Sequence, residues 1–293
     1  MLDIRAPDHL GDGVMALPAI RALAALGPAR IYAPRWGPEL YEGLHDALHG
    51  ALEVRPVTAR PDGDIGVLLK PSFGAAWRWR HLPRRIGLAT AGRGPLLTDV
   101  VPVRAEHRRE GFARVAALLG AEVTGLPTYS RRGHAPGSLP ARFVGLNPWS
   151  PSATVRWPHF RALADQLVDE GRGVVFFAGP GEGAAVRAIA GPHAVVEGLS
   201  LPDFAAALDR CGVFVSNDSG AAHFAAACGT RVVVVHGSTT AARTGVGAAV
   251  EGPDLWCRPC YGKRCFVGLG CLRGIDPDEV AAVVERVAGE SAA

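Results

Sequence analysis

Short runs of β-branched and aromatic residues alternate with longer stretches rich in Ala and Leu along the chain. Apolar runs of strand length that are separated by helical stretches predict an α/β fold with parallel sheets. In the first half, the pattern predicts strands at 2–6, 30–33, 65–70 and 85–88 and helices at 14–26, 38–48 and 108–119. In the second half, it predicts strands at 143–147, 173–178, 194–197, 212–216 and 231–236 and helices at 157–170, 182–190, 201–210, 219–228 and 277–289.

Residues that start or end elements refine this pattern. Pro18 is expected to mark a helix start or restart, because proline fits only the first turn of a helix. Asp276 is expected to cap the last helix. The segment AEVTGLPTYSRRGHAPGSLP at 121–140 is rich in Pro, Gly and Arg and shows no periodicity, so it is the predicted linker. The chain is therefore expected to form two domains, 1–138 and 139–293.

Composition excludes several classes of protein. Hydrophobic residues are 48% and charged residues 20% of the chain, which rules out a disordered protein. The net charge of +3 argues against a nucleic-acid-binding protein, which should carry a clear basic excess. No apolar run approaches the ~20 residues that a membrane-spanning helix needs. Asp3 and Asp8 are unlike a signal peptide, so a cytoplasmic protein is expected.

Ligands of open α/β sheets bind at the carboxyl ends of the strands. After the first predicted strand the chain reads HLGDGVMALPAIRAL, in which Gly11 and Gly13 allow a tight turn around Asp12. A carboxylate at this point faces the crevice and is stabilised by the free amides of the helix start. The alternative is that Asp12 only caps the helix, which is a common use of Asp.

A second polar loop lies in the segment FVGLNPWSPSATVRWPHF, after the first predicted strand of the second half. Ser150, Ser152 and Thr154 supply hydroxyl groups, and Arg156 supplies a fixed positive charge. This set of groups suits a diphosphate at a strand end. The alternative is an ordinary polar loop.

The segment VVFFAGPGEGAAV matches the glycine-rich dinucleotide fingerprint in its G-x-G-x-x-A form, through Gly179, Gly181 and Ala184. Glu197 lies about 20 residues further on, at the end of the next predicted strand, as NAD binding requires. An NAD-linked oxidoreductase is therefore an alternative function. The D-x-D pair at 62–64 precedes its strand, at the wrong end for a ligand, and is interpreted as a turn.

The segment GVFVSNDSGAAHFAAACGTRVVVVHGST places polar turns at two adjacent strand ends. Asn217 and Asp218 end one strand, and the amides of 219–221 open a helix. Such a helix start binds anions, because free N–H groups and the helix dipole both favour negative charge. His223 lies one turn into the same helix, although a histidine of this kind can also be a core residue. The turn at 237–239 lies beside it.

In their order along the chain, these segments resemble glycosyltransferase family 9, the ADP-heptose:lipopolysaccharide heptosyltransferases, and within it the heptosyltransferase II-like branch. The matching segments are LGDGVMALPAIRAL, LLKPSFGAAWRWRHLPRRIGL, WSPSATVRWPHF, FFAGPGE, SNDSGAAHFAAACGTRVVVVHGST and CRPCYGKRCFVGLGCLRGIDPDEV, which cover nearly the full chain. The resemblance implies a GT-B fold, in which two Rossmann-like domains face each other across a cleft. It assigns the acceptor mainly to the first domain and the nucleotide sugar to the second.

The resemblance also implies an activity: inverting, metal-independent transfer of a heptose or related sugar from an ADP-sugar to a hydroxyl of a lipopolysaccharide core or similar glycan. Asp12 is similar to the family's proposed general base. The amides of Ser219 and Gly220 would hold the diphosphate, and Glu182 would reach the nucleoside ribose. Donor-binding roles are implied for Ser150, Ser152, Thr154, Arg156, Glu182, Asp218, Ser219, Gly220, His223, Gly237 and Thr239.

The acceptor side is expected in the segment LLKPSFGAAWRWRHLPRRIGL. A phosphorylated or acidic glycolipid suits its positive charge, and peripheral contact with the inner face of the cytoplasmic membrane follows from such an acceptor. A solvated amphipathic helix is the alternative. The expected acceptor-binding residues are Lys70, Ser72, Arg78 and Arg80, in an Arg-rich run that continues to Arg84 and Arg85, with Trp77 and Trp79 against lipid or sugar.

Where the family usually has a Lys, this chain has Val155, and Arg156 supplies a positive charge one residue further on. This departure favours a third alternative, a non-catalytic protein that binds nucleotide sugars.

Four of the six cysteines crowd into one segment near the C-terminus, and no cofactor is expected for the transfer itself. The Cys-x-x-Cys start suits a structural zinc or iron site with four thiolates, although the second pair is more widely spaced. Reduced thiols or a disulfide are the alternatives. The remaining two cysteines, Cys211 and Cys228, are expected to be small core residues. The four clustered residues are Cys257, Cys260, Cys265 and Cys271.

Overall fold

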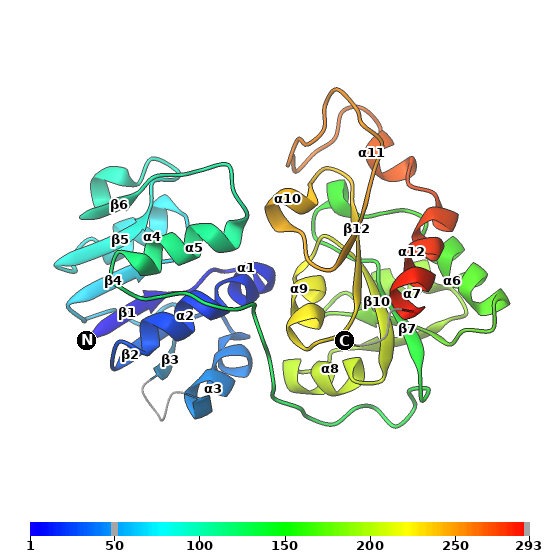
Figure 1. Ribbon diagram of the computed structural model, residues 1–293, viewed down its shortest axis with the longest axis horizontal. Coiled ribbons are helices and arrows are strands. Elements are labelled where there is room, and N and C mark those ends of the chain that lie inside the picture. The colour runs from blue at the N-terminus through cyan, green and yellow to red at the C-terminus, as the bar shows by residue number, and fades with distance from the viewer. Residues whose placement is uncertain (48–51, 290–293) are drawn as a thin grey trace. The chain divides into compact units, whose positions relative to one another are not determined.

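The computed structural model describes residues 1–47 and 52–289 and divides into two compact units, Met1–Ser130 and Arg131–Ala293, called unit 1 and unit 2 below (Figure 1). The predicted linker is irregular, but the division comes earlier than the expected boundary at 138. The reason is that the end of the linker packs on unit 2. The Arg132 guanidinium pairs with Asp209 (2.7 Å), and the His134 amide donates to Asp203 (2.8 Å).

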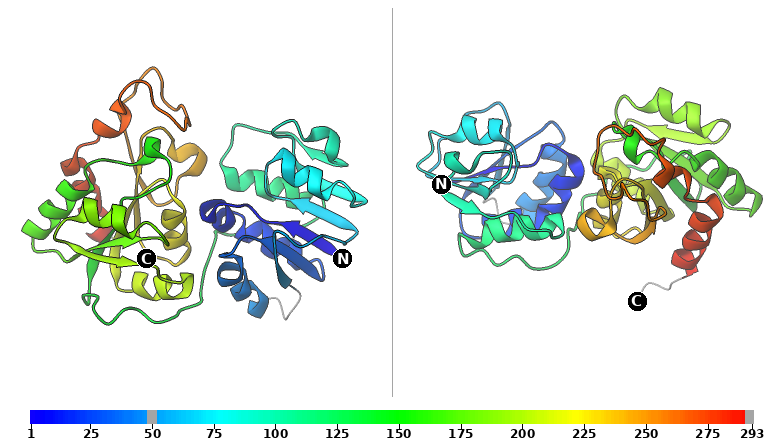
Figure 2. Two further views of the ribbon diagram at one scale, coloured as in Figure 1. Left: turned by 180° about the vertical axis from the view of Figure 1, so that it is seen from behind. Right: turned by 90° about the horizontal axis from the view of Figure 1, so that it is seen from above.

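Unit 1 is a six-stranded parallel sheet with helices on both faces (Figures 1 and 2). Its strand order is β3-β2-β1-β4-β5-β6. Its elements are β1 (Leu2–Arg5), α1 (Leu10–Met15), α2 (Leu17–Ala24), β2 (Ala29–Ala33), α3 (Gly37–Ala47), β3 (Leu52–Pro56), β4 (Ile65–Leu68), α4 (Phe73–Trp79), β5 (Arg84–Leu88), the 3₁₀ helix η1 (Gly94–Leu96), β6 (Asp99–Val101) and α5 (Arg108–Ala117).

Unit 2 repeats this architecture, with the strand order β12-β11-β10-β7-β8-β9, all parallel. Helices α8 and α9 lie on one face of its sheet, and α6, α7 and α12 lie on the other (Figure 1). Its elements are β7 (Phe143–Asn147), η2 (Ala153–Val155), α6 (Phe160–Asp169), β8 (Val174–Ala178), α7 (Gly183–Ala190), β9 (Ala194–Glu197), α8 (Leu201–Leu208), β10 (Cys211–Asn217), α9 (Gly220–Ala227), β11 (Val232–His236), α10 (Ala241–Thr244), β12 (Ala248–Glu251), α11 (Gly270–Arg273) and α12 (Pro277–Gly289). The prediction of two Rossmann-like α/β units is confirmed.

The predicted elements of the sheet centres are confirmed, whereas the edge strands β3, β6 and β12 escaped prediction. Each of them is short and partly exposed, but β9, which is also a partly exposed edge strand, was predicted at 194–197. The helix predicted at 14–26 is broken at Ala16, and Pro18 lies in the first turn of α2, as expected. The helix predicted at 38–48 is α3, and position 48 lies outside the described residues.

Two polar details of the prediction are also confirmed. The Asp276 carboxylate accepts the Asp278 amide at the start of α12 (2.9 Å). The D-x-D pair is a turn, since the Asp3 carboxylate on β1 accepts the amides of Asp62 (3.0 Å) and Gly63 (2.8 Å). In the part of the chain that the structure describes, no helix has the length and apolar character to cross a lipid bilayer.

Candidate functional site

Each sheet has one point at which the chain reverses the direction in which it adds strands. In unit 1 this switch point lies between β1 and β4, and in unit 2 it lies between β7 and β10. The loops that leave two such strands diverge, and the crevice between them is where open α/β sheets bind ligands. The residues singled out by the sequence follow these strands: Asp12 after β1, Lys70 after β4, Ser150 after β7 and Asp218 after β10.

Asp12 lies in the first turn of α1 with its side chain 11% exposed. Arg108 Nη1, at the start of α5, donates a hydrogen bond to Asp12 Oδ1 (2.6 Å). Among the described residues no other group hydrogen-bonds this carboxylate, so the helix-capping interpretation is wrong and Oδ2 is available to accept a proton. Gly13 is needed for packing rather than for a turn, because a Cβ there would lie 2.4 Å from the Trp36 ring.

At the end of β4, Lys70 Nζ pairs with the Asp8 carboxylate (2.7 Å), to which Arg5 also donates. Burial alone would raise the pKa of Asp8, but the hydrogen bonds from Lys70 and Arg5 outweigh it and hold this pKa below its usual range. The fully buried Arg93 donates to the Leu68 carbonyl (3.2 Å) and to that of Lys70, and burial lowers its pKa to about 10. Cations therefore outnumber carboxylates at this switch point.

The other expected acceptor residues lie on or near α4. Ser72 caps this helix through its hydroxyl, which accepts a first-turn amide (3.3 Å). Arg78 donates to the Val57 carbonyl in the loop between β3 and β4 (3.1 Å). The Arg80 guanidinium lies over the exposed Trp77 ring, 4.1 Å from its centre. These contacts place Ser72 in a structural role and leave the two arginines at the surface.

Three residues expected to face the acceptor serve the fold instead. Trp79 is only 1% exposed and packs edge-on against Tyr32, because it lies on the side of α4 that faces the sheet. Arg84 on β5 pairs with Asp99 on β6 (2.9 Å). Arg85 donates to a carbonyl of η1 (2.7 Å). The Arg-rich run therefore reaches the surface only in part.

In unit 2, Asp218 joins β10 to α9, with its side chain 12% exposed. Thr244 Oγ1 on α10 donates to Asp218 Oδ2 (2.7 Å). His223 Nε2 and His236 Nδ1 each lie 3.9 Å from a carboxylate oxygen of Asp218. No Lys or Arg forms an ion pair with this carboxylate within the described ranges.

His236 ends β11 and is completely buried. Burial lowers the pKa of its imidazole, an effect that the carboxylates of Asp218 and Glu251 oppose. Its Nδ1 shares a hydrogen bond with Thr239 Oγ1 (3.1 Å). Its Nε2 and the Ser238 hydroxyl oxygen are buried without a partner among the described residues. Both atoms lie where β11 ends and the turn after it begins.

Ser219 precedes α9, and its hydroxyl shares a hydrogen bond with Ser216 Oγ (2.9 Å) rather than capping the helix. The first turn of α9 starts at Gly220. Its amides have no acceptor within the helix, because no helical carbonyl lies four residues before them. The last residue of β10 is linked to the chain that follows β7. Asn217 accepts the Trp157 amide (2.8 Å) and donates to the Pro148 carbonyl (2.7 Å). These hydrogen bonds hold the carboxyl ends of β7 and β10 together.

Hydroxyls fix the loop after β7 internally. Ser152 Oγ and Thr154 Oγ1 share a hydrogen bond (2.8 Å), and the Ser152 amide donates to Ser150 Oγ (3.3 Å). Thr154 Oγ1 also donates to the Gly262 carbonyl (2.6 Å). Since Thr154 is buried and doubly bonded, the loop is held against the segment that contains Gly262.

The positive charge of this loop is held close to it. The Arg156 guanidinium lies 3.4 Å from the centre of the Trp149 ring and donates to the Ser150 carbonyl. Burial lowers the pKa of Arg156, and the Glu182 carboxylate opposes this effect. Glu182 accepts the Gly179 amide (2.9 Å), so its carboxylate folds back over its own glycine loop.

The glycine loop itself lies away from the switch point. Gly179, Gly181, Ala184 and Glu197 line one pocket of about 450 Å³, as the dinucleotide pattern suggests. The loop nevertheless follows β8, whereas the fingerprint normally follows the first strand of the fold, here β7. Glu197 is also paired with Arg187 (2.8 Å). The topology therefore does not favour the dinucleotide interpretation.

Gly237 and Thr239 lie in a turn that packs beneath α11. A Cβ on Gly237 would come within 2.4 Å of the Leu272 side chain, so only glycine fits. Arg258 Nε donates to the Gly237 carbonyl (2.6 Å), and Arg258 Nη2 donates to the Thr239 carbonyl (3.3 Å). These contacts fix the turn that follows β11.

The segment 253–269, between β12 and α11, carries most of the clustered cysteines. All six cysteines of the chain lie among the described residues and are free thiols, so the disulfide alternative is not observed. Burial raises the pKa of Cys271, and the neighbouring thiols raise it further. No three His, Cys, Asp or Glu side chains of the described residues are arranged to hold a metal ion. Residues that line one cavity of about 180 Å³ include Cys257, Cys260, Cys265 and Cys271.

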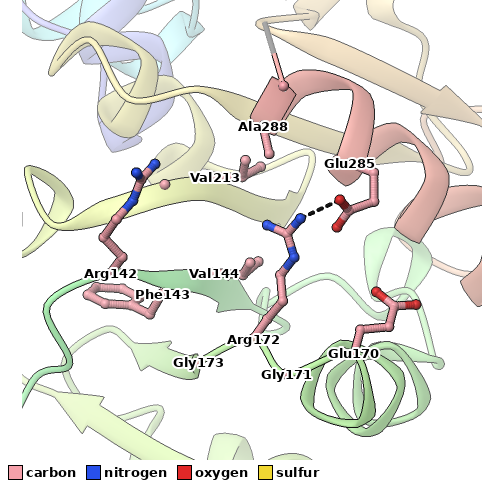
Figure 3. Close-up of a pocket in the computed structure, with 12 residues that line it drawn as sticks. Arg142, Phe143, Val144, Glu170, Gly171, Arg172, Gly173, Val213, Glu285 and Ala288 are labelled. Carbon is pink, nitrogen blue, oxygen red and sulfur yellow. Dashed lines mark hydrogen bonds and ion pairs between the residues drawn. The ribbon is translucent and has the colours of Figure 1, made fainter. Parts of the chain in front are cut away.

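A larger pocket, of about 540 Å³, lies at the amino ends of the strands of unit 2 (Figure 3). Its lining includes Phe143 at the start of β7 and Gly173 just before β8. An ion pair between Arg172 and Glu285 of α12 crosses it. Ligands of parallel sheets bind at the carboxyl ends of strands, so this pocket at the amino ends is not a candidate site.

Four residues contact the expected carboxylates and hydroxyls but were not predicted from the sequence. They are Arg108, Asn147, His236 and Thr244. Asn147 Oδ1 lies 3.4 Å from Ser219 Oγ. Because Asn147 ends a buried apolar strand, the sequence pattern could have indicated it. Arg108 and Thr244 approach from distant elements, and nothing local in their segments marks them.

Comparisons with known proteins agree with this fold. The model of glycosyltransferase family 9 (heptosyltransferase) matches residues 62–268. A search of curated proteins found no match. The fold is similar to that of *E. coli* ADP-heptose LPS heptosyltransferase II, with 20% identity, 98% of each chain covered and a TM-score of 0.74.

Two further solved structures share the fold. *E. coli* heptosyltransferase WaaC, solved with ADP-2-deoxy-2-fluoro heptose, has 17% identity over 97% of this chain and 99% of its own, with a TM-score of 0.72. TibC from enterotoxigenic *E. coli*, described as an iron-containing dodecameric glycosyltransferase, has 16% identity over 97% of this chain and 75% of its own, with a TM-score of 0.70.

Proposed function

This chain belongs to glycosyltransferase family 9, and we propose that it transfers a heptose or related sugar from an ADP-sugar to a hydroxyl of a lipopolysaccharide core or similar glycan. The observation that carries this proposal is the presence of a nearly buried carboxylate at each switch point, Asp12 in unit 1 and Asp218 in unit 2. Heptosyltransferase WaaC, which shares the fold, was solved with an ADP-heptose analogue, and this supports ADP-heptose as the donor.

The donor is assigned to unit 2. The first-turn amides of α9 would hold the diphosphate, since a helix start combines free N–H groups with a favourable dipole. Arg156 supplies the positive charge of the neighbouring loop. Asp218 accepts hydrogen bonds from sugar hydroxyls, and the His236 imidazole lies 3.9 Å from its carboxylate.

The acceptor is assigned to unit 1. Arg5 and Lys70 pair with Asp8, and Arg108 pairs with Asp12. The buried Arg93 adds a cation next to the Lys70 carbonyl, so the switch point has a net positive charge. An acidic or phosphorylated sugar is the acceptor that this charge attracts. Arg78 and Arg80 extend the positive surface along α4.

The transfer is a single displacement with inversion. Asp12 accepts the proton of the acceptor hydroxyl while that oxygen forms a bond to the anomeric carbon of the donor. The bond from this carbon to the diphosphate oxygen breaks, and ADP leaves with the electron pair. The amides of α9 and the Arg156 guanidinium stabilise the negative charge on the leaving group.

Binding and product analysis test the proposal together. ADP-heptose should raise the melting temperature of the protein more than UDP-glucose, GDP-mannose or NADH, because a ligand that binds only the folded state stabilises it by about 2.7 kcal/mol at a hundred times its Kd. With a heptose-deficient lipopolysaccharide core as acceptor, NMR should show a product whose anomeric configuration is opposite to that of the donor. Retention of configuration contradicts the displacement, and stabilisation by NADH alone contradicts the assignment of the donor.

For the cysteines, we propose a structural zinc or iron site. Four thiols line one cavity, and thiolates are preferred ligands of both metals. TibC, which is described as iron-containing, shares the fold. The thiols as arranged form no coordination sphere, so metal binding requires their side chains to converge. Elemental analysis of the purified protein should find one metal ion per chain that is lost in Cys260→Ser but kept in the control Cys211→Ser.

A further inference from the structure

The segment 253–269 exposes two aromatic rings almost completely. It extends from the body of unit 2 between β12 and α11 (orange in Figures 1 and 2). Trp256 is 89% exposed and Phe266 is 92% exposed, the largest exposed fractions among the large apolar side chains of the described residues. Val267 and Tyr261 of the same segment are also exposed. Full exposure of such rings is unfavourable in water and marks a surface that binds a partner.

The rings lie on a segment that is fixed at its base. Arg258 hydrogen-bonds to carbonyls at the end of β11, and the Tyr261 amide donates to the Ser238 carbonyl (3.0 Å). The Gly262 carbonyl accepts from Thr154 (2.6 Å). These bonds tie the segment to the two loops that we assign to the donor, so the exposed rings belong to an anchored structure.

The charge of this surface is positive. Lys263 and Arg264 are exposed, and neither forms an ion pair within the described part of the chain. Asp254 is the single acidic residue of the segment. Two free cations between two exposed aromatic rings are the combination that binds the interface of an anionic bilayer, where rings lie at the level of the headgroups and cations contact phosphates.

We propose that the segment 253–269 docks unit 2 onto an anionic lipid bilayer, with Trp256 and Phe266 in the interface and Lys263 and Arg264 on lipid phosphates. The aromatic surface of α4 fits this role less well. Its Trp77 is only half-exposed and already lies beneath the Arg80 guanidinium.

A second copy of the chain is a poorer occupant. A two-fold contact through this surface would bring its unpaired cations close to the same cations of the partner, which is destabilising. A bilayer that contains anionic lipid offers the opposite charge. If the proposed function is right, docking brings the donor site of unit 2 to the surface in which a glycolipid acceptor lies.

Vesicle binding tests this proposal without donor or acceptor, so its failure would leave the transfer assay unaffected. The full chain should co-sediment with vesicles of equimolar phosphatidylcholine and phosphatidylglycerol, and much less with pure phosphatidylcholine. Lys263→Glu/Arg264→Glu should weaken this binding by roughly tenfold or more. Trp256→Ser/Phe266→Ser should weaken it similarly. The control Val103→Ser/Leu126→Ser, which removes two exposed apolar side chains from unit 1, should leave it unchanged.

Fluorescence quenching locates the contact. Brominated lipids should quench the tryptophan emission of the wild type and of Trp77→Phe, and the quenching should be lost in Trp256→Phe, which retains a ring able to enter the interface. The proposal is overturned if the wild type does not bind anionic vesicles, or if Trp256→Phe is quenched as strongly as the wild type. It is also overturned if the aromatic double variant binds normally, or if this variant only dissolves an oligomer detected by light scattering.

Discussion

Asp12 and Asp218 occupy equivalent places in two units of the same architecture, yet their surroundings differ. Each follows a strand that borders a switch point, and each is nearly buried. Asp12 is paired with a guanidinium, that of Arg108. Asp218 has a hydroxyl donor, Thr244, and two imidazoles at 3.9 Å.

This difference shows that the fold supplies the place and that side chains from other elements supply the role. Arg108 comes from α5 and Thr244 from α10, and neither belongs to the strand or helix that carries its carboxylate. A carboxylate with one oxygen fixed by a guanidinium is oriented to take a proton from a substrate hydroxyl with the other oxygen. A carboxylate beside neutral donors is suited to bind hydroxyl groups. The comparison predicts distinct consequences for the two equivalent substitutions.

Asp12→Asn should have the largest effect. An amide cannot accept the proton of the acceptor hydroxyl, so the rate of transfer should fall by about 10²–10⁴-fold, the usual contribution of a general base. The affinity for the ADP-sugar, measured by calorimetry, should not change. Asp64→Asn, at an exposed carboxylate of the same unit, is the matched control and should transfer at the wild-type rate. Wild-type turnover in Asp12→Asn would remove the assignment of the base.

Asp218→Asn should act on binding instead. Loss of a charged hydrogen-bond acceptor should weaken the affinity for the ADP-sugar by roughly tenfold or more. The affinity for ADP should change little, because ADP lacks the sugar that this carboxylate is assigned to hold. Calorimetry with both ligands measures the difference, with Asp254→Asn as the control. Equal losses for ADP and for the ADP-sugar would place Asp218 on the nucleotide and contradict the comparison.

The sequence predicted the two carboxylates because the signals for them are local. Gly-Asp-Gly after the predicted strand at 2–6, and Asn-Asp-Ser-Gly after a buried apolar run, each indicate a strand end and a helix start, whatever the rest of the chain does. Central strands such as β8 and β11 were predicted from a local signal too, since burial on both faces favours continuous apolar runs.

What the sequence did not reveal depends on contacts between distant segments. The partners of the carboxylates are set by how α5 and α10 pack, and Trp79 was expected at the surface because a helix of arginines and tryptophans does not show which ring is buried. Three edge strands were missed although β9, an edge strand that is also partly exposed, was predicted, so local pattern does not decide which segments pair at the edge of a sheet. Local pattern therefore predicted positions, and tertiary packing determined neighbours.

Arg108→Gln should sharpen the comparison with a moderate effect. The guanidinium fixes one oxygen of Asp12, so its loss should lower kcat by about tenfold through misorientation of the base, with the donor affinity unchanged. Arg108→Lys retains a cation and should recover part of the rate. Arg109→Gln, whose side chain pairs with Glu110, is the neighbouring control. If Arg108→Lys is as slow as Arg108→Gln, the fork of donors and not the charge holds Asp12.

The smallest effect is expected from the pH dependence of stability at His236. Burial lowers the pKa of this imidazole in the folded protein below the value of about 6.5 for a free histidine. Below that pH the unfolded chain therefore binds a proton that the folded chain resists, and the free energy of unfolding falls as the pH drops. The loss is at most about 1.4 kcal/mol per pH unit.

His236→Gln should remove this slope, whatever it does to the stability at neutral pH. Urea unfolding at about pH 7 and about pH 5.5 measures the difference between the two values, and His9→Gln at an exposed histidine is the control. A slope that persists in His236→Gln would assign the proton to another group. The neutrality of the His236 imidazole would then no longer be supported, and the contrast between Asp218 and Asp12 would rest on the neutral donor Thr244 alone.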